Sequence, residues 1–414
     1  MIYGFLSTIL FILILPFWLA LGLFKRKLIA GFKEKCGYFE SPELKDSIVF
    51  YGVSVGEINA LENLIKKTKE TFSNPIVVCT GTQTGQEIAK KKLEKFVDFI
   101  TYFPYDFPFC VGHFLNKVNP KVVIVAETEL WPNFARLVKN RGIDLMIING
   151  RISDRTYKSY KKLSFFFKPI LQNYTKILTQ SNKDNEKLIS IGANPNTTKV
   201  MGNLKFDIAK KDCDIDLGQG RIIIAGSTHS GEDEIILPVF ERIKKDFSDA
   251  KLLVAPRHPE RQNAVKKLIE ATGLSWGLRS KGDKFDDKEI IMLDTMGELG
   301  KAYALCDFAF IGGSFNKTGG HNPLEATIFE KPTISGSCVN NFKDIYALLT
   351  QTGASKIVAN AEELEEYMRK LLSDSDFYKK CCEDCKTVFA QNQGALEYVI
   401  KELGEICAVR NWNF

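Results

Sequence analysis

Short apolar runs alternate with longer charged segments along most of this chain, and that alternation limits the folds open to it. Strands that alternate with helices form βαβ units, which build mostly parallel sheets. A first series of expected strands covers residues 48–51, 76–80, 99–102, 122–126, 145–149 and 177–179. A second series covers residues 221–225, 252–255, 290–293, 308–311, 333–335 and 356–358. The pattern predicts an α/β protein.

The stretch between the two series, residues 206–220, has the composition of a linker. It is rich in Asp, contains Gly218 and Gly220, and lacks apolar periodicity. A chain of 414 residues is also too long for one typical core. We therefore expect two Rossmann-like domains, at 28–205 and 221–414, that face a central cleft in which a small molecule binds.

The amino-terminal segment is the strongest compositional signal. Residues 2–24 are almost wholly apolar, and as a helix of about 23 residues they would span roughly 35 Å, enough for a bilayer. No small-residue cleavage site follows, and Lys25, Arg26 and Lys27 favour a cytoplasmic location for the rest of the chain. We expect a retained membrane anchor at 1–27. Pro16 and its aromatic neighbours leave open a segment that lies in the interface without crossing.

Charge and cysteine content exclude some classes of function. The net charge of +6 permits contact with anionic lipid or phosphate, and no basic stripe with an aromatic nucleic-acid motif is present, so we expect no nucleic-acid partner. The ten cysteines have no disulfide framework, which is typical of reduced thiols. One Cys-x-x-Cys pair, Cys382 and Cys385, lacks further ligands for zinc, and we expect no metal site.

Residues 47–57 join an apolar strand to a turn that ends in a carboxylate, Glu57. The carboxyl edge of a parallel sheet is where ligands bind, so Glu57 is a candidate general base. A Glu in the first turn of a helix is also favoured by the helix dipole without any catalytic role. The sequence alone leaves both interpretations open at this position.

Three further charged residues of the first half stand at strand ends or at the linker. Glu127 and Glu129 follow the expected strand 122–126, where Glu127 would stabilise positive charge or orient an acceptor hydroxyl and Glu129 would cap the next helix. Lys205 stands where the linker begins and would reach the cleft from there. Further basic residues between 151 and 162 precede Phe165, a pattern typical either of an anionic lipid surface or of a solvated helix beside an aromatic core.

Three turns of the second half follow expected strands and suit an anionic ligand. The turn that starts at Gly226 would present backbone N–H groups, and Arg257 would offer a guanidinium fork to phosphate or carboxylate. Glycine pairs at 312–313 and 319–320 keep side chains out of the cleft, while Pro323 and Leu324 begin a helix. Glu325 would accept hydrogen bonds from a ribose diol.

Together these segments resemble one family, the 3-deoxy-D-manno-octulosonate (Kdo) transferases of lipopolysaccharide assembly. The resemblance rests on the order and spacing of motifs at 54–57, 104–106, 127–133, 149–151, 205–207, 226–229, 256–261, 294–299, 319–325, 341–344 and 392–395. It implies a GT-B glycosyltransferase, inverting and metal-independent, that moves Kdo from CMP-Kdo to a 6'-hydroxyl of a lipid A precursor (lipid IVA). It also implies a location at the cell inner membrane, with the catalytic domains on the cytoplasmic side, and contact with its lipids.

The resemblance assigns roles by motif. By this resemblance, Glu57 stands at the position of the family's general base. Glu127 and Lys205 stand at the positions of its transition-state stabilisers. The implied CMP pocket comprises Pro256, Arg257, Met296, Gly297, Glu298, Asn322, Pro323, Leu324 and Glu325. CMP-Kdo is a co-substrate, and no cofactor is implied. Two departures affect only local packing and the shape of the acceptor pocket: Tyr51-Gly52 where the family usually has His and a small residue, and Gly150 in place of Ala.

Two rival functions remain compatible with the pattern. One is a GT-B enzyme that uses a UDP-sugar, or a sugar-nucleotide epimerase of similar architecture, although an epimerase would not need a membrane anchor. The other is a membrane-tethered nucleotide or lipid binding protein without catalysis, which would leave Glu57 and Glu127 unexplained. The sequence carries no signal for an oligomeric state.

Overall fold

The computed structural model describes residues 3–4, 8–9, 13 and 31–410. The chain divides into two compact units, one formed by Met1–Asp207 with Asn392–Phe414 and the other by Ile208–Gln391. The predicted anchor, residues 1–27, lies almost entirely outside the described residues. Among the residues that are described, no helix combines the length and the apolar character needed to cross a membrane.

The first unit is built on a parallel sheet with the strand order β3-β2-β1-β4-β5-β6-β7. Its strands are β1 (Ser47–Gly52), β2 (Ile76–Thr80), β3 (Phe99–Tyr102), β4 (Pro120–Ala126), β5 (Asp144–Gly150), β6 (Lys176–Thr179) and β7 (Thr198–Val200). The order reverses between β1 and β4, which makes the carboxyl ends of these two strands the topological switch point.

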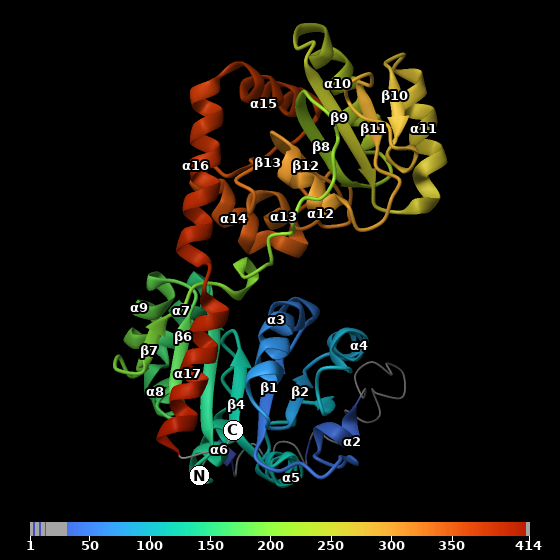
Figure 1. The fold of residues 1–414 in the computed structure, drawn as a ribbon. Coiled ribbons are helices and arrows are strands. Elements are labelled where there is room, and N and C mark those ends of the chain that lie inside the picture. The colour runs from blue at the N-terminus through green and yellow to red at the C-terminus, as the bar shows by residue number, and fades with distance from the viewer. Residues whose placement is uncertain (1–2, 5–7, 10–12, 14–30, 411–414) are drawn as a thin grey trace. The chain divides into compact units, whose positions relative to one another are not determined.

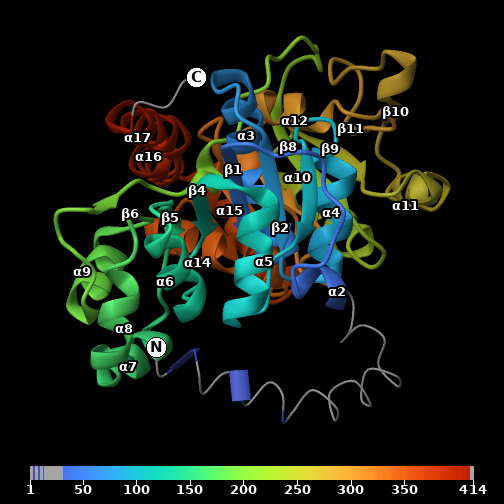
Figure 2. The same ribbon diagram turned by 90° about the horizontal axis from the view of Figure 1, so that it is seen from below.

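Helices cover both faces of this sheet (Figure 2). They are α2 (Phe32–Lys35), α3 (Val55–Thr71), α4 (Gln83–Leu93), α5 (Pro108–Val118), α6 (Pro132–Asn140), α7 (Asp154–Lys162), α8 (Ser164–Leu171) and α9 (Asn182–Ile191). Their starts follow local rules: α5 and α6 have Pro at the first helical position, and Thr82 accepts from Gly85 N at 3.1 Å to cap α4. A single 3₁₀ turn, η2 (Leu204–Phe206), follows β7.

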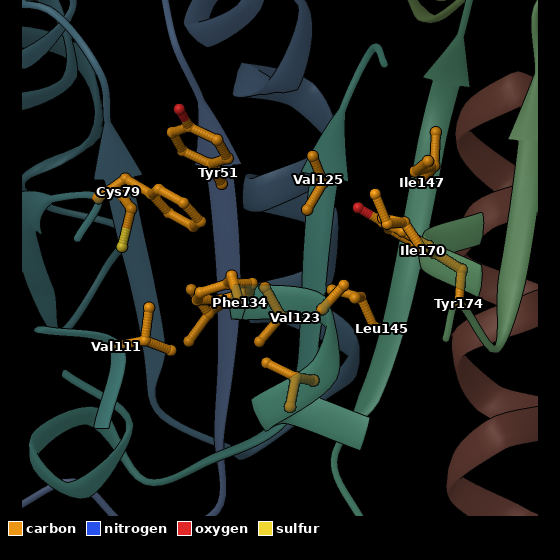
Figure 3. Close-up of a cluster of buried hydrophobic side chains, with 14 of the residues drawn as sticks. Tyr51, Cys79, Val111, Val123, Val125, Phe134, Leu145, Ile147, Ile170 and Tyr174 are labelled. Carbon is orange, nitrogen blue, oxygen red and sulfur yellow. The ribbon is translucent and has the colours of Figure 1, made fainter. Parts of the chain in front are cut away.

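Successive residues of the buried strands pack into separate cores on the two faces. Val49 and Tyr51 of β1 join Phe114 of α5 and Phe134 of α6 in one cluster, part of which is drawn in Figure 3. Ile48 and Phe50 join side chains of α3 and α4 in the other. This alternation is the period of two that a strand covered on both faces requires.

The second unit repeats the architecture with the parallel strand order β10-β11-β9-β8-β12-β13-β14, which reverses between β8 and β12. Its strands are β8 (Arg221–Thr228), β9 (Ala250–Pro256), β10 (Trp276–Leu278), β11 (Ile290–Met292), β12 (Phe308–Ile311), β13 (Thr333–Ser335) and β14 (Ser355–Ile357). Its helices are α10 (Asp233–Asp246), α11 (Gln262–Ala271), α12 (Leu299–Ala302), α13 (Leu324–Thr327), α14 (Lys343–Thr352), α15 (Ala361–Ser373) and α16 (Ser375–Asn392). Short 3₁₀ turns are η3 (Pro259–Arg261), η4 (Arg279–Lys281), η5 (Tyr303–Leu305) and η6 (Asn340–Phe342).

The last helix, α17 (Ala395–Val409), belongs to the first unit, so the predicted second domain at 221–414 extends too far (Figure 1). Val399 and Leu403 lie in the core formed with β1 and α3, and Lys176 of β6 forms an ion pair with Glu402. The Asp207 carboxylate accepts from Gly394 N at 2.7 Å and from Leu396 N at 2.6 Å, which fixes the start of the helix. Sequence proximity to α16 misled the prediction, because the partner of α17 is almost 350 residues away at β1.

We predict that Leu403→Ala destabilises the first unit and leaves the second unchanged. Leu403 is 1% exposed, and truncation of a fully buried leucine costs about 2–5 kcal/mol of unfolding free energy. Hydrogen–deuterium exchange should accelerate in the strands of the first sheet. Lys401→Ala, on the exposed face of the same helix, is the control and should exchange like the wild type. Accelerated exchange confined to β8–β14 would contradict the assignment of α17.

Candidate active site

The carboxyl edge of the first sheet gathers the charged residues of three turns. Glu57 lies in the first turn of α3, which follows β1, while Glu127 and Glu129 follow β4 and Arg151 follows β5. These strands are neighbours in the sheet, and all of them end at the same edge because they run parallel. The predicted base and its predicted partner carboxylate therefore meet at the switch point.

The Glu57 carboxylate is oriented by the turn that precedes α3. Its Oε2 accepts from Val53 N at 2.7 Å, and its Oε1 accepts from Ser54 Oγ at 2.9 Å. A carboxylate has about four lone-pair sites, so these two bonds leave acceptor capacity. Burial raises the pKa of Glu57, the bond from Val53 opposes the rise, and the negative charge of Glu127 adds to it. Glu57 therefore stabilises the start of α3 through these two bonds. It also keeps a carboxylate that can accept a proton.

Glu127 is held in an uncommon backbone conformation beside a cation. Its φ of 57° lies in the left-handed region, and its N–H donates to Ile148 O at 2.9 Å. Arg151 Nε donates to Glu127 Oε2 at 3.0 Å, and Thr128 Oγ1 bonds both the N–H and the carbonyl of Arg151. Non-glycine residues in this region occur preferentially at functional sites, where the surrounding contacts hold them.

Glu129 completes a cluster of three carboxylates, which sequence reasoning did not foresee. Burial raises the pKa of Glu129 to about 7, and the negative charges of Glu57 and Glu127 contribute to the rise. Two neighbouring carboxylates with separated pKa values are a recurrent way to assign base and acid roles. Near neutral pH, Glu129 therefore takes up and releases a proton while it sits beside Glu57.

The predicted role of Glu129 as the cap of the next helix is wrong. Helix α6 starts at Pro132, and the N–H groups of Asn133 and Phe134 donate to Asp106 at 3.1 and 2.7 Å. Burial raises the pKa of Asp106 to about 6, and the two backbone bonds oppose the rise. The motif at 104–106 therefore has a structural role, and its partner lies too far along the chain for a local capping pattern to reveal it.

Tyr51, the departure from the expected His, points into the core of the first unit. Its ring stacks on Phe103 with the ring centroids 3.7 Å apart, and burial raises its pKa, with a further contribution from Glu129 and Glu57. Tyr51 is therefore a neutral neighbour of the carboxylates that packs where an imidazole was expected.

Lys205 lies on η2, whose backbone is fixed to the same edge of the first sheet. Leu204 N donates to Asn149 Oδ1 at 3.1 Å, and Lys205 N donates to Asn203 Oδ1 at 3.1 Å. Asn149 stands at the carboxyl end of β5 with a φ of 53°. The structure thus brings the segment that carries Lys205 to the edge where Glu57 and Glu127 lie.

The carboxyl edge of the second sheet carries the predicted phosphate turns, and a buried carboxylate binds part of their backbone. The Glu232 carboxylate, fully buried, accepts from the N–H groups of His229, Gly313, Ser314 and Phe315 at 2.7–2.9 Å. Of these four donors, only His229 N belongs to the turn that starts at Gly226, where backbone N–H groups were predicted to face a ligand. A charge-assisted network of this kind ties the two turns together.

At the carboxyl edge of the second sheet, side chains are available to bind a ligand. Arg257 is exposed at the end of β9, and His229 and His321 meet through their Nε2 atoms, 2.9 Å apart. Asn322 Oδ1 accepts from Leu324 N at 3.1 Å to start α13, in which Leu324 is buried and Glu325 is exposed. All of these residues follow β8, β9 or β12, the strands at and beside the switch point.

The remaining predicted pocket residues have mixed surroundings. Met296 is 79% exposed and Gly297 has a φ of 86°, so the loop after β11 presents its surface freely. Glu298 accepts from Arg279 Nη2 at 3.2 Å and from the Thr295 hydroxyl. Among the residues from 31 to 410, no group of His, Cys, Asp and Glu is arranged to hold a metal ion, and all ten cysteines are free thiols.

Two Rossmann-like parallel sheets in one chain, each with charged side chains at its switch point, define a two-domain α/β architecture of the GT-B type. A domain model described as 3-Deoxy-D-manno-octulosonic-acid transferase (kdotransferase) matches residues 30–208. The 3-deoxy-D-manno-octulosonic acid transferase of Haemophilus influenzae is 34% identical over 85% of this chain and 85% of its own length. The chain belongs to the Kdo transferase family and is a glycosyltransferase.

Other comparisons are consistent with this assignment. A bifunctional glycosyltransferase/methyltransferase of Fusobacterium nucleatum is 36% identical over 87% of this chain, which spans 58% of that relative's length. The crystal structure of MurG from Acinetobacter baumannii aligns with 87% of this chain and 99% of its own, with a TM-score of 0.55 and 12% identity. At that identity the likeness concerns the fold alone.

We predict that Glu232→Ala destabilises the second unit, because four backbone donors lose their acceptor. Removing one partner from a buried charged network costs about 3–5 kcal/mol of unfolding free energy. Denaturant unfolding followed by hydrogen exchange in β8–β14 measures the loss. Glu234→Gln, an exposed carboxylate two residues further along, is the control and should change stability little. Wild-type stability of Glu232→Ala would contradict the role given to this carboxylate.

We predict that Arg151→Ala raises the pKa of Glu57 above its wild-type value. Arg151 lowers the pKa of Glu57 by its positive charge, and its removal also leaves the Glu127 charge uncompensated. NMR titration of protein labelled with 13C at Glu side chains measures the shift. Arg151→Lys keeps the charge and should stay closer to the wild type. An unchanged titration in Arg151→Ala would show that the two carboxylates do not sense this cation.

Proposed function

We propose that this enzyme transfers Kdo from CMP-Kdo to the 6'-hydroxyl of a lipid A precursor, lipid IVA, with inversion and without a metal ion. The observation that carries the proposal is the Glu57 carboxylate, which lies at the switch point of the first sheet, is oriented by two hydrogen bonds and has a raised pKa. A general base works best when its pKa lies closer to the operating pH than that of an ordinary carboxylate. The donor and the acceptor are those that the family resemblance implies.

In the proposed mechanism Glu57 removes the proton of the acceptor hydroxyl as its oxygen attacks the anomeric carbon of Kdo. The bond from that carbon to the phosphate oxygen breaks, and its electron pair leaves with CMP. Inversion follows because attack and departure occur on opposite faces of the sugar. Glu127, fixed by Arg151, stabilises the positive charge that develops on the sugar, and Lys205 stabilises developing negative charge.

The ionisation of Glu57 sets the sign of the pH dependence. The base works only as a carboxylate, and its pKa lies above the ordinary value because of burial. Activity should therefore fall as the pH is lowered through this raised pKa. Because Glu57 and Glu129 interact, the apparent pKa seen on the acid side of the pH–activity profile is a property of both carboxylates together.

The donor site in this proposal occupies the carboxyl edge of the second sheet. Arg257 binds the phosphate with its guanidinium group, and the residues from Asn322 to Glu325 hold the ribose and base, with Pro256, Met296, Gly297 and Glu298 completing the CMP pocket. The exposure of Arg257 at the end of β9 and of Glu325 on α13 supports this assignment. A UDP-sugar is the alternative donor. Comparing the binding of cytidine and uridine nucleotides distinguishes the two donors.

The site in the cell is also a proposal. We infer that residues 1–27 anchor the enzyme to the cytoplasmic side of the inner membrane. The corner between α7 and α8 offers a further lipid contact, since Leu163 is 47% and Phe165 77% exposed beside the exposed lysines 158, 161 and 162. Phe166 and Phe167 instead pack partly against the core. The expectation of an aromatic core therefore applies to these two residues, and that of a lipid surface to Leu163 and Phe165.

We predict that Glu57→Gln lowers kcat by at least about 10²-fold, because a positioned general base contributes roughly 10²- to 10⁴-fold. Release of CMP in the presence of a lipid A precursor measures the rate. Glu70→Gln, an exposed carboxylate on the same helix, is the matched control and should keep wild-type activity. Retention of most activity by a correctly folded Glu57→Gln enzyme would exclude Glu57 as the base.

We predict that CMP stabilises the wild type against heat more than UMP or UDP does. A ligand at one hundred times its Kd adds about 2.7 kcal/mol of stability. Arg257→Ala should weaken CMP binding by about ten- to a hundredfold, the cost of a lost charge-assisted hydrogen bond. Lys267→Ala, an exposed cation on α11, is the control. Equal stabilisation by uridine nucleotides would favour the UDP-sugar alternative.

A further inference from the structure

Two histidines at the carboxyl edge of the second sheet share a hydrogen bond that constrains their protons. His229 Nε2 and His321 Nε2 are 2.9 Å apart, and the two rings are nearly parallel, with an angle of 18° between them. A neutral imidazole carries one N–H, so one ring donates at Nε2 and the other accepts there. If both rings were fully protonated, both Nε2 atoms would be donors and the bond would be lost. The pair therefore holds two protons when neutral and three at most.

The surrounding turns fix this arrangement. His321 N donates to Gly312 O at 3.1 Å, and Gly320 N donates to Gly313 O at 2.7 Å, which ties the segment that carries His321 to the end of β12. A Cβ atom at Gly313 would lie 3.1 Å from His321 Cδ2, and Gly313 has a φ of 70°. Glycine at this position therefore leaves the space that the His321 ring occupies.

The charges that face the pair come from three elements. Arg257 and His258 follow β9, Arg261 belongs to η3, and Glu232 lies at the start of α10. Burial lowers the pKa of His321 to about 4, and His229, Arg257 and His258 add to the effect. Burial also lowers the pKa of His229, although the Glu232 charge opposes this. Without a ligand, the pair is neutral at neutral pH.

Glu232 accepts four backbone N–H groups, so its hydrogen-bonding capacity is used there while its charge still acts on His229. Arg261 is likewise committed, since its guanidinium bonds Asp233 at 2.5 Å and Thr228 O at 2.9 Å. An anion placed beside Arg257 and the two imidazoles would reverse the balance of charge there. A third proton on the pair would then be favoured.

We propose that His229 and His321 act as a proton-sharing pair that takes up one proton from solvent when the phosphate of the cytidine nucleotide binds beside Arg257. The inference rests on the proposed donor site and deepens it by naming the groups that meet the phosphate. During transfer the bond from the anomeric carbon to the phosphate oxygen breaks, and its electron pair adds one negative charge to the phosphate. The proton held by the pair compensates that charge at the moment it forms.

Calorimetric titration of the full chain with CMP tests the proposal. Titrations at about pH 8, in two buffers of different ionisation enthalpy, give the number of protons exchanged on binding, because CMP itself is then fully ionised. We expect the wild type to take up about one proton on binding. The association constant for CMP should then fall by up to about tenfold for each unit by which the pH is raised. Cytidine, which lacks the phosphate, should bind without proton uptake.

Variants locate the proton. His321→Gln and His229→Gln should each abolish the uptake, since a single imidazole loses its hydrogen-bonded partner. His258→Gln is the matched control: its ring packs edge-on against His229 with the centroids 5.1 Å apart and forms no part of the pair. It should keep the wild-type uptake. Gly313→Ala should reduce the uptake by displacing the His321 ring, without removal of either histidine.

The outcomes separate this inference from the proposed function. Binding of CMP by the wild type without proton uptake would overturn the pair's role and leave the CMP donor site standing. Wild-type uptake in both His321→Gln and His229→Gln would also overturn it. A wild type that does not bind CMP at millimolar concentration would overturn the donor site and the inference together. Loss of uptake in the pair variants, with uptake intact in His258→Gln, supports it.

Discussion

The parallel alignment of strands is the constraint on which both sites depend. Because every paired strand of each sheet runs in the same direction, the turns that follow β1, β4 and β5 end at one edge, as do those that follow β8, β9 and β12. Residues up to 92 positions apart are thereby brought into hydrogen-bond distance, as for Arg151 with Glu127 and His229 with His321. The apolar strands that enforce the alignment carry no chemistry themselves, and their two-sided burial gives the edge its rigidity.

At the carboxyl edge of each sheet, a carboxylate accepts hydrogen bonds from the backbone. The two carboxylates differ in how many of their lone pairs are occupied, and this difference explains their different roles. Glu232 is fully buried and accepts four N–H groups, so its lone pairs are occupied and its function is structural. Glu57 accepts only one backbone N–H and one hydroxyl, and it stands beside two other carboxylates. Spare acceptor capacity and neighbouring negative charge are what make a carboxylate a usable base.

The sequence predicted the parts of this enzyme that local patterns encode. Apolar runs gave the strands from β1 to β14 except β7 and β10, in which Lys199 and Gly277 stand in place of a continuous apolar run. The strand-end positions of Glu57, Glu127 and Arg257 followed from the same runs. Contacts between distant residues could not be predicted: the Asp106 cap of α6, the packing of α17 on the first unit, and the Glu232 network, whose donors lie 81–83 positions away at the glycine turn. The raised pKa of Glu129 and the contact between His229 and His321 could not be predicted, because both arise only from neighbours in space.

A structure of the Glu57→Gln enzyme with donor and acceptor bound tests the central claim most directly. If Glu57 is the base, the acceptor hydroxyl oxygen should lie within about 2.6–3.2 Å of the side chain at position 57, on the side of the sugar away from the phosphate. A hydroxyl that instead contacts Glu129, with position 57 out of hydrogen-bond reach, would contradict the account and transfer the role of base to the neighbouring carboxylate.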